Sequence, residues 1–171
     1  MKKSSKGFTL IELVIVVAIL AITLTITSDI LISLVRSNNK TRIQNELEQQ
    51  SNFVSLKLEK ELRNAQSVDS SENTELSLTL ENSEEITYSL NEGNGVLLRD
   101  KDGTTDPVTS AHEPGGVSVS CGSSGCFNVE GTTPQRVNVS LVFEPSTSGT
   151  LGTSFTGKVE VNTTVVLRNT Y

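Results

Sequence analysis

The feature that most constrains this chain is an apolar run near its N-terminus, from Phe8 to Val35. Of the 20 residues from 8 to 27, 15 are apolar, and Glu12 and Asp29 are the only charged residues in the whole run. A helix of about 20 residues is roughly 30 Å long, which is the thickness of a bilayer core. A buried core helix is the alternative, but a chain of 171 residues cannot easily surround such a segment. We therefore expect a membrane span.

Three lysines (Lys2, Lys3 and Lys6) precede this run and predict its orientation. Basic flanks stay in the cytoplasm, so we expect the N-terminus inside and the rest of the chain outside. A secretory signal would be followed by a cleavage site of small residues, and none follows here. The apolar run leads directly into more helix, so we expect it to be retained rather than removed.

Glu12 is unusual because a carboxylate inside an apolar span costs roughly 2.5 kcal/mol or more at the bilayer centre, and less near the interface. Two interpretations follow. The acid either lies close enough to the interface to reach water, or it requires a cationic partner within the membrane.

The residues around Glu12 read KGFTLIEL, from 6 to 13, and they resemble the cleavage and methylation motif of type IV prepilins and type II secretion pseudopilins. In that family a membrane aspartyl peptidase cuts after the glycine and methylates the new N-terminal amine. The resemblance implies a prepilin peptidase cleavage site between Gly7 and Phe8, N-methylation of Phe8, and a role for Glu12 in assembly. It covers only the N-terminal part of the chain, so the rest is interpreted on its own.

Beyond the apolar run, the pattern predicts an amphipathic helix over residues 36–66. No Gly or Pro lies between Phe8 and Glu92, and apolar residues recur at helical spacing. We expect Phe53 and Leu56 to widen the apolar stripe, and Glu61 to lie with the charged residues on the other faces. The stripe itself consists of Ile43, Leu47, Val54, Leu58, Leu62 and Ala65.

Residues 67–171 have the composition of a β-sheet head, since 11 of the 12 Gly and all 4 Pro lie from Gly93 onward. Alternating polar and apolar residues predict a hairpin of two strands and a later pair of longer ones. The predicted fold is α+β, with a long N-terminal helix packed against an antiparallel head. Its parts are a leader (1–7), a transmembrane and assembly helix (8–35), an amphipathic helix (36–66) and the head. The expected strands cover 75–80, 85–90, 96–99, 117–120, 137–143 and 158–167.

Cys121 and Cys126 enclose four small residues. Outside the cytoplasm disulfides persist, so we expect a disulfide that closes this tight loop. A redox pair or half of a metal site are the alternatives, although a zinc site would lack ligands because the chain has no other Cys and one His.

A second loop, Asp100 to Asp106, resembles the D-x-D-G-x-x-D pattern of some calcium loops, because its carboxylates surround a glycine turn. Asp-Gly is equally the turn of a hairpin in solvent, and we favour that interpretation over a metal site.

Composition argues against two broad classes of function. The net charge of −6 is unsuited to a surface that binds nucleic acid directly. No set of nucleophile, base and acid can be assembled around the single His112, and Glu84 with Glu85 fits a solvated face. We therefore expect no enzyme, no catalytic residues, no bound metal and no cofactor.

The resemblance implies a structural subunit that enters the cytoplasmic membrane, is cleaved and methylated, and joins a periplasmic or extracellular fibre. Its partners would be the prepilin peptidase and methylase, other pilin or pseudopilin subunits and the assembly platform in the inner membrane. Residues 58–65 and 164–169 are similar to segments of minor pilins, which favours a minor or tip subunit. The alternative is a membrane-anchored adhesion module whose loops (100–116, 121–126 and 145–157) recognise a surface or ligand.

Overall fold

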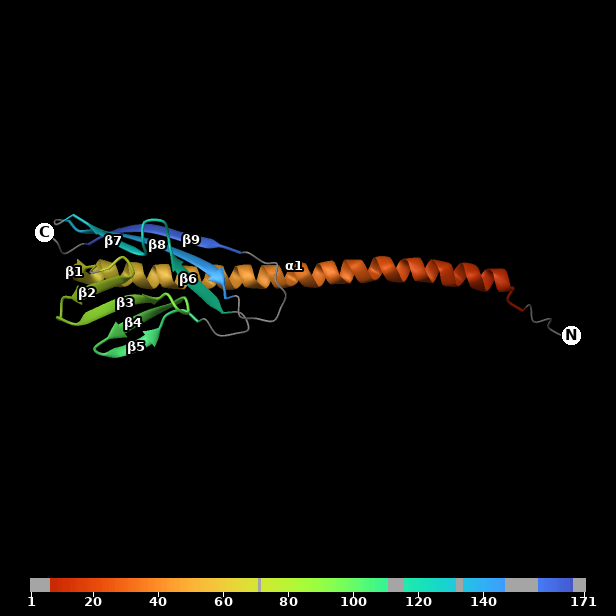
Figure 1. Cartoon of the computed structure of the whole chain (residues 1–171), viewed down its shortest axis with the longest axis horizontal. Helices are drawn as coiled ribbons and strands as arrows, with labels where there is room; N and C mark the ends of the chain where they lie inside the picture. The colour runs from red at the N-terminus through yellow and green to blue at the C-terminus, as the bar shows by residue number, and fades with distance from the viewer. Residues whose placement is uncertain (1–6, 71, 111–115, 132–133, 147–156, 168–171) are drawn as a thin grey trace. The chain divides into compact units, whose positions relative to one another are not determined.

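The structure is a computed structural model that describes residues 7–70, 72–110, 116–131, 134–146 and 157–167. A long helix, α1 (Leu10–Asn64), is followed by antiparallel strands, so the predicted α+β class is confirmed (Figure 1). The residues up to Thr41 and those from Arg42 onward form two separate compact units, and α1 contributes to both. The second unit contains all the strands.

In the second unit, one face of α1 is buried beneath the strands. Leu47, Val54, Leu58 and Leu62 are each no more than 1% exposed, and Ser51 lies on the same face. Their spacing of three or four residues places them along one side of a helix. The predicted apolar stripe is therefore the helix side of the core.

Two details of the predicted helix are wrong. Phe53 and Leu56 do not widen the buried stripe, because they are 55% and 67% exposed. Glu61 lies off the apolar stripe, as predicted, but it contacts strands of the head, which was not predicted. The helix ends at Asn64, and the following residues form strand β1 (Ala65–Asp69), where helix was expected through residue 66.

The first sheet is a five-stranded antiparallel meander in the order β1-β2-β3-β4-β5. Strands β2 (Glu75–Leu80) and β3 (Glu85–Asn91) form the predicted hairpin, with Leu78 opposite Ile86. Strand β4 (Val96–Lys101) extends the strand expected at 96–99, and β5 (Thr104–Pro107) was not predicted. Alternate residues of β2 and β3 are buried, so one face of this sheet belongs to the core.

The second sheet is built around β8 (Arg136–Pro145), which carries partners on both edges. Strand β9 (Val159–Val166) pairs along one edge, as the sequence predicted for the two longer strands. Strands β6 (Val117–Cys121) and β7 (Phe127–Glu130) pair with opposite ends of β8, and β7 was not predicted. The head thus contains two sheets.

The two sheets approach each other at Gly95, in the turn between β3 and β4. The Val119 N–H donates to the Gly95 carbonyl at 2.7 Å. Gly95 has a φ of 64°, and a Cβ at this position would overlap the side chain of Ser118. A glycine is therefore required where the first sheet contacts strand β6.

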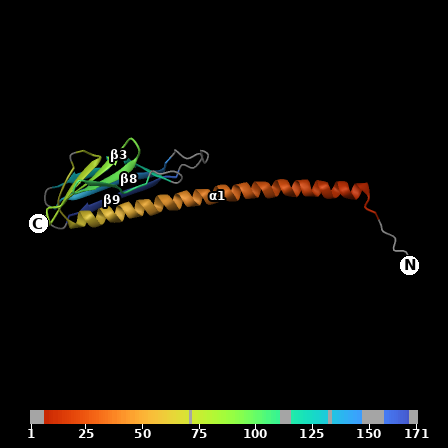
Figure 2. The same cartoon turned by 90° about the horizontal axis from the view of Figure 1, so that it is seen from below.

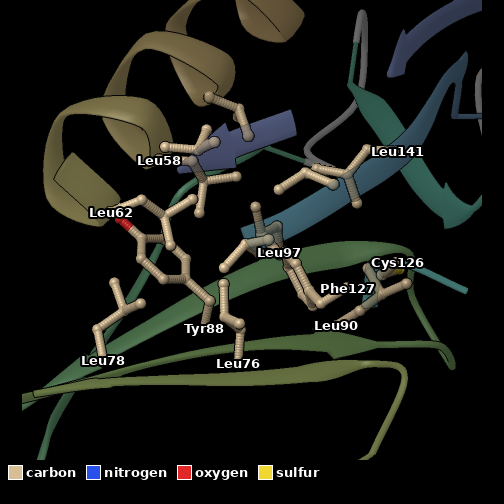
Figure 3. Close-up of a cluster of buried hydrophobic side chains, with 14 of the residues drawn as sticks. Leu58, Leu62, Leu76, Leu78, Tyr88, Leu90, Leu97, Cys126, Phe127 and Leu141 are labelled. Atoms are coloured by element: carbon tan, nitrogen blue, oxygen red, sulfur yellow. The ribbon is translucent and has the colours of Figure 1, made fainter. Parts of the chain in front are cut away.

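The core of the second unit lies between α1 and the two sheets. Figure 2 shows both sheets on the same side of the α1 residues that belong to this unit. In Figure 3, Leu62 lies beside the ring of Tyr88, and Phe127 lies near Leu90. Tyr88, Phe127 and Phe143 are fully buried, so these three aromatic residues belong to the core.

A polar cluster also joins α1 to the first sheet. The Tyr88 hydroxyl donates to Glu61 Oε2 at 2.6 Å, and Arg99 Nη2 lies 3.1 Å from Glu61 Oε1. Burial, and next the Glu61 carboxylate, raise the pKa of Tyr88 far above its ordinary value. The side chains of Arg99 and Glu61 are only 15% and 18% exposed, so this ion pair is far better shielded than a surface pair.

Candidate processing and assembly segment

The peptide bond between Gly7 and Phe8 precedes α1 and is accessible. Gly7, Phe8 and Thr9 are exposed and belong to no helix or strand. A Cβ at Gly7 would meet no atom within 4 Å, and Gly7 is not among the glycines with positive φ. The described part of the chain therefore gives no steric reason for glycine here, and a requirement for it would have to come from a partner that binds this bond.

Helix α1 begins directly after this bond. The Thr9 carbonyl accepts the first helical hydrogen bonds, from the N–H groups of Glu12 at 3.2 Å and Leu13 at 3.3 Å. Glu12 lies in the first turn, where the partial positive charge of the helix N-terminus favours a carboxylate. Among the residues that the structure describes, nothing pairs with this carboxylate. Glu12 is therefore available to a cation that this part of the chain does not supply.

The apolar run is exposed along its whole described length. Every residue from Gly7 to Arg42 is exposed, including Leu20 at 54% and Ile32 at 51%. Within the described residues, α1 is the one helix long and apolar enough to cross a membrane. Water would make such a surface costly, at roughly 25 cal/mol per Å² of apolar area. This segment needs a lipid or protein environment.

Of the six hydroxyl residues in the apolar run, four donate to backbone carbonyls of the same helix. Thr25 Oγ1 donates to the Ala21 carbonyl at 2.9 Å, and Ser28 Oγ donates to the Leu24 carbonyl at 2.9 Å. Thr23 and Thr27 make the same kind of bond. Each of these hydroxyls has a hydrogen-bond partner within the helix and needs no water molecule, so they are compatible with an apolar environment.

Comparison with known protein families agrees with this geometry. The family described as the prokaryotic N-terminal methylation motif matches residues 2–28. The chain carries the signature of type IV prepilin- and pseudopilin-like proteins. No curated protein and no solved structure matches the chain.

The prepilin-type motif implies processing by a prepilin peptidase and assembly with other pilin-type subunits. Together with the apolar helix, it indicates membrane anchoring. It also marks a structural family that is generally not enzymatic. The match ends at residue 28, so the head is interpreted from its own structure.

The two cysteines lie at the end of strand β6 and just before strand β7. Cys121 and Cys126 form a disulfide, with their Cα atoms 4.4 Å apart. The Ser140 N–H donates to the Cys126 carbonyl, and the N–H groups of Cys126 and Phe127 both donate to the Asn73 carbonyl. The bridged loop is thus an excursion from one edge of β8 that contacts the β1–β2 turn. Cys126 itself is fully buried.

The acidic loop of the head is the turn between β4 and β5. Lys101 pairs with Thr104, and the turn residues Asp102 and Gly103 have φ of 54° and 80°. Asp100 Oδ1 accepts a hydrogen bond from the Gly103 N–H, and its Oδ2 accepts one from the Thr105 hydroxyl. No group of three or more metal-ligating side chains occurs among the described residues. The geometry is that of an Asp-Gly hairpin turn.

The remaining candidate residues are not brought together. The Lys101 ammonium lies 2.9 Å from Glu84 Oε2, and its hydrogen bond lowers the pKa of Glu84. Glu85 is exposed, and His112 lies outside the described residues. The leader residues 1–6, most of the 145–157 loop and residues 168 and 169 also lie outside them.

The Glu61, Tyr88 and Arg99 cluster is the arrangement that sequence reasoning missed. Periodicity placed Glu61 away from the apolar stripe, and it does follow a different helical row from Leu58 and Leu62. The signal for it would have been an Arg and a Tyr directly opposite each other on neighbouring strands, as Tyr88 and Arg99 are. Cross-strand neighbours of this kind can meet one helical carboxylate together.

Proposed function

We propose that this chain is a prepilin-type structural subunit. It enters the cytoplasmic membrane with its N-terminus inside and its head outside. It is cut between Gly7 and Phe8, and the new Phe8 amine is methylated. It then joins a type IV pilus-like or type II secretion fibre. In this proposal residues 1–7 are the leader and 8–35 the membrane and assembly helix, followed by the amphipathic part of α1, which ends at Asn64, and by the head.

The observation that carries the proposal is an accessible Gly7–Phe8 bond followed at once by an exposed apolar helix. That helix contains an acid, Glu12, with which no residue in the described part of the chain pairs. A peptidase needs an accessible, extended bond, and a glycine lets the backbone enter a narrow cleft. Helices that leave the membrane need other apolar helices to cover them. Both requirements point to partners rather than to contacts within this chain.

Glu12 has a specific role in this proposal. Cleavage creates a positively charged amine at Phe8, four residues before the carboxylate. Within one helix these groups are about one turn apart, and in a bundle of staggered helices the amine of one subunit can face Glu12 of its neighbour. The intersubunit pair would fix axial register, because a displaced helix would leave two charges unpaired in an apolar core.

We further propose a minor or tip position in the fibre, because residues 58–65 and 164–169 are similar to segments of minor pilins. The fibre could belong to a pilus, a secretion system or a DNA-uptake system. Counting the copies of this chain in sheared fibres, relative to the other subunits, tests this finer proposal.

Intact-mass measurement of membrane-extracted protein tests the processing step. We expect a mature chain that begins at Phe8 and carries one additional methyl group. Gly7→Ala should accumulate the uncleaved form, whereas Ser5→Ala, a change two residues away, should be processed normally. A mature N-terminus beyond Ala21 would indicate an ordinary signal peptide and would overturn the proposal.

Glu12→Gln and Glu12→Ala test the assembly step. Both variants should insert and be cleaved, but they should be largely absent from the sheared fibre fraction and remain in the membrane fraction. Glu46→Gln is the matched control, since Glu46 is an exposed acid of α1 outside the apolar run. Normal incorporation of Glu12→Ala would show that the acid is merely tolerated near the interface.

A further inference from the structure

Asp29 is the second acid in the apolar run, and processing creates no partner near it. Arg36 is the first cation after the run and follows Asp29 by seven residues. Among the residues that the structure describes, neither side chain has an ion-pair or hydrogen-bond partner. Two turns of one helix separate them by roughly 10 Å, which is too far for a pair within one chain.

The surroundings of Asp29 leave its carboxylate available. The nearby hydroxyls of Thr25 and Ser28 already donate to backbone carbonyls of their own helix. A shallow hollow on the helix surface is lined by Asp29, Ile30, Ser33, Leu34, Ser37 and Asn38. Because Ser33 and Ser37 are small, a long side chain from another helix has room to reach Asp29 on their side of the hollow.

An unpaired Asp29 becomes costly once neighbouring helices cover the apolar run. The run from Phe8 to Val35 corresponds to about 42 Å of helix, whereas a bilayer core is about 30 Å thick. Apolar residues lie on both sides of Asp29, and Leu31, Ile32 and Leu34 are all more than half exposed. When neighbouring helices cover these residues, they also enclose Asp29, and an enclosed carboxylate requires a cation.

We infer that Asp29 forms an ion pair with Arg36 of a second copy of this chain, which lies parallel to the first and is displaced along the helix axis by about seven residues. Residues one heptad apart face the same neighbour when helices wrap around one another. Arg can also reach toward the helix N-terminus, because side chains tilt in that direction.

The contact is heterologous, because Asp29 of one copy meets Arg36 of the other. The inference rests on the proposed function only in placing parallel α1 helices side by side. It adds that this chain has itself as a neighbour, so that a minor subunit of this kind would occur in at least two adjacent copies.

Cysteine crosslinking of the full chain in its own membranes tests the register while both charges stay in place. The only two cysteines of the chain are joined in the Cys121–Cys126 disulfide, so an introduced thiol would be the sole free one. Chains with Ser33→Cys are expressed together with differently tagged chains carrying Asn39→Cys. Ser33 follows Asp29 by one turn, and Asn39 follows Arg36 by nearly one turn on the facing side.

Oxidation should crosslink the Ser33→Cys and Asn39→Cys chains to each other. The control moves the first thiol to Leu31→Cys, which lies nearly opposite Ser33 around the helix, and should reduce the crosslink several-fold. Two chains that both carry Ser33→Cys should also crosslink poorly, because the displacement separates identical positions. Equal crosslinking in all three combinations would overturn the inference.

Charge reversal then tests the ion pair itself. Asp29→Arg or Arg36→Asp alone should reduce the Ser33–Asn39 crosslink several-fold, and the double reversal should restore it. If the double reversal fails to restore it, the inference is wrong. If the double reversal fails but Arg36→Lys leaves the Ser33–Asn39 crosslink unchanged, the partner of Arg36 would be a lipid phosphate.

The proposed function can fail independently of this pair. If the chain never reaches the fibre fraction but shows a crosslink that double reversal restores, the ion pair is supported and the proposed fibre function is wrong. If the chain enters fibres without the crosslink, the fibre function is supported and the ion pair is wrong.

Discussion

The two halves of helix α1 carry similar apolar residues, but these are exposed in the first half and buried in the second. Leu20 and Ile32 in the first unit are 54% and 51% exposed, whereas Leu47 and Leu62 in the second are fully buried. The second half has its partner within the same chain, and the first half has none among the described residues. Apolar content therefore has two meanings here: in the head it builds a core, and near the N-terminus it indicates a membrane or other subunits.

The largest effect on stability should come from truncating a side chain on the buried side of α1. Leu58 is 1% exposed, so Leu58→Ala should lower the free energy of unfolding by about 2–5 kcal/mol through lost contacts and a cavity. Urea unfolding of the detergent-solubilised full chain, followed by the circular dichroism of the strands, measures this loss.

Two matched changes sharpen the contrast between the halves of α1. Leu56→Ala removes the same atoms two residues away, but Leu56 is 67% exposed, so we expect a change within about 0.5 kcal/mol. Leu20→Ala should leave unfolding of the head unchanged. A similar loss for Leu56→Ala and Leu58→Ala would contradict the assignment of the buried face.

The next effect should come from the polar contact between α1 and the first sheet. Glu61→Gln leaves the guanidinium of Arg99 without its carboxylate in a site where both side chains are mostly shielded. We expect a loss of about 2 kcal/mol, as for hydrogen bonds to charged groups. The same unfolding measurement detects it.

Glu59→Gln is the control for Glu61→Gln. Glu59 pairs with Arg63 one turn away on the same helix, but at the surface, with side chains 36% and 52% exposed. Exposed pairs at this spacing contribute only about 0.3–0.5 kcal/mol. Equal losses for the two substitutions would show that Glu61 behaves as a surface acid.

Much of this fold could be predicted from the sequence, because its strongest signals are local. The uninterrupted run without Gly or Pro predicts α1, and alternation predicts the hairpin of β2 and β3. Three strands were missed. Strand β1 continues the helical spacing through Ala65, whereas β5 (Thr104–Pro107) has no apolar alternation and is exposed throughout.

Strand β7 was missed for a different reason. It is short, and it exists because Phe127 and Val129 pair with β8 beyond the bridged loop. The division of the head into two sheets likewise depends on contacts between residues far apart in the sequence, such as Gly95 with Val119. Local patterns contain no information on such pairings, nor on which strands meet Glu61.

For the candidate processing segment, the sequence identified the residues and the structure added little. Gly7, Phe8 and Glu12 were identified from the sequence, and the structure adds the accessibility of the bond and the absence of a partner for Glu12 among the described residues. The use of these residues depends on molecules outside the chain. Biochemical measurements on this segment are therefore more informative than its fold.

An effect of similar size should follow from opening the disulfide. It closes a short loop, so chain entropy predicts about 2 kcal/mol of stabilisation, and reduction of the wild-type chain should lower the free energy of unfolding by that amount. Replacing both cysteines by Ala should match reduction. Replacing both by Ser should cost more, because a hydroxyl would be buried at Cys126.

These cysteine variants should still fold, since the core between α1 and the sheets is intact. Alkylation before and after reduction should show two additional thiols in exported protein. Two free thiols in native protein would remove the basis of this prediction. Equal stability of the Ala and Ser variants would show that position 126 is hydrated.

The smallest expected effect is a change in alkaline behaviour that only the buried half of the molecule should show. Burial and the Glu61 carboxylate raise the pKa of Tyr88, so the folded head retains the phenol proton where an unfolded chain loses it. Stability from this group is complete below about pH 10 and falls as the pH rises further, because only the unfolded state releases the proton.

The chain has two tyrosines, so Tyr171→Phe leaves Tyr88 as the only source of tyrosinate absorbance. In that variant we expect no absorbance change near pH 10, and at higher pH a change that coincides with loss of the circular dichroism signal. Adding Glu61→Gln should bring ionisation to lower pH, because the neighbouring negative charge is removed. Ionisation of Tyr88 near pH 10 in a fully folded chain would mean that its hydroxyl is open to water. The buried contact of Tyr88 with Glu61, between α1 and the first sheet, would then be wrong.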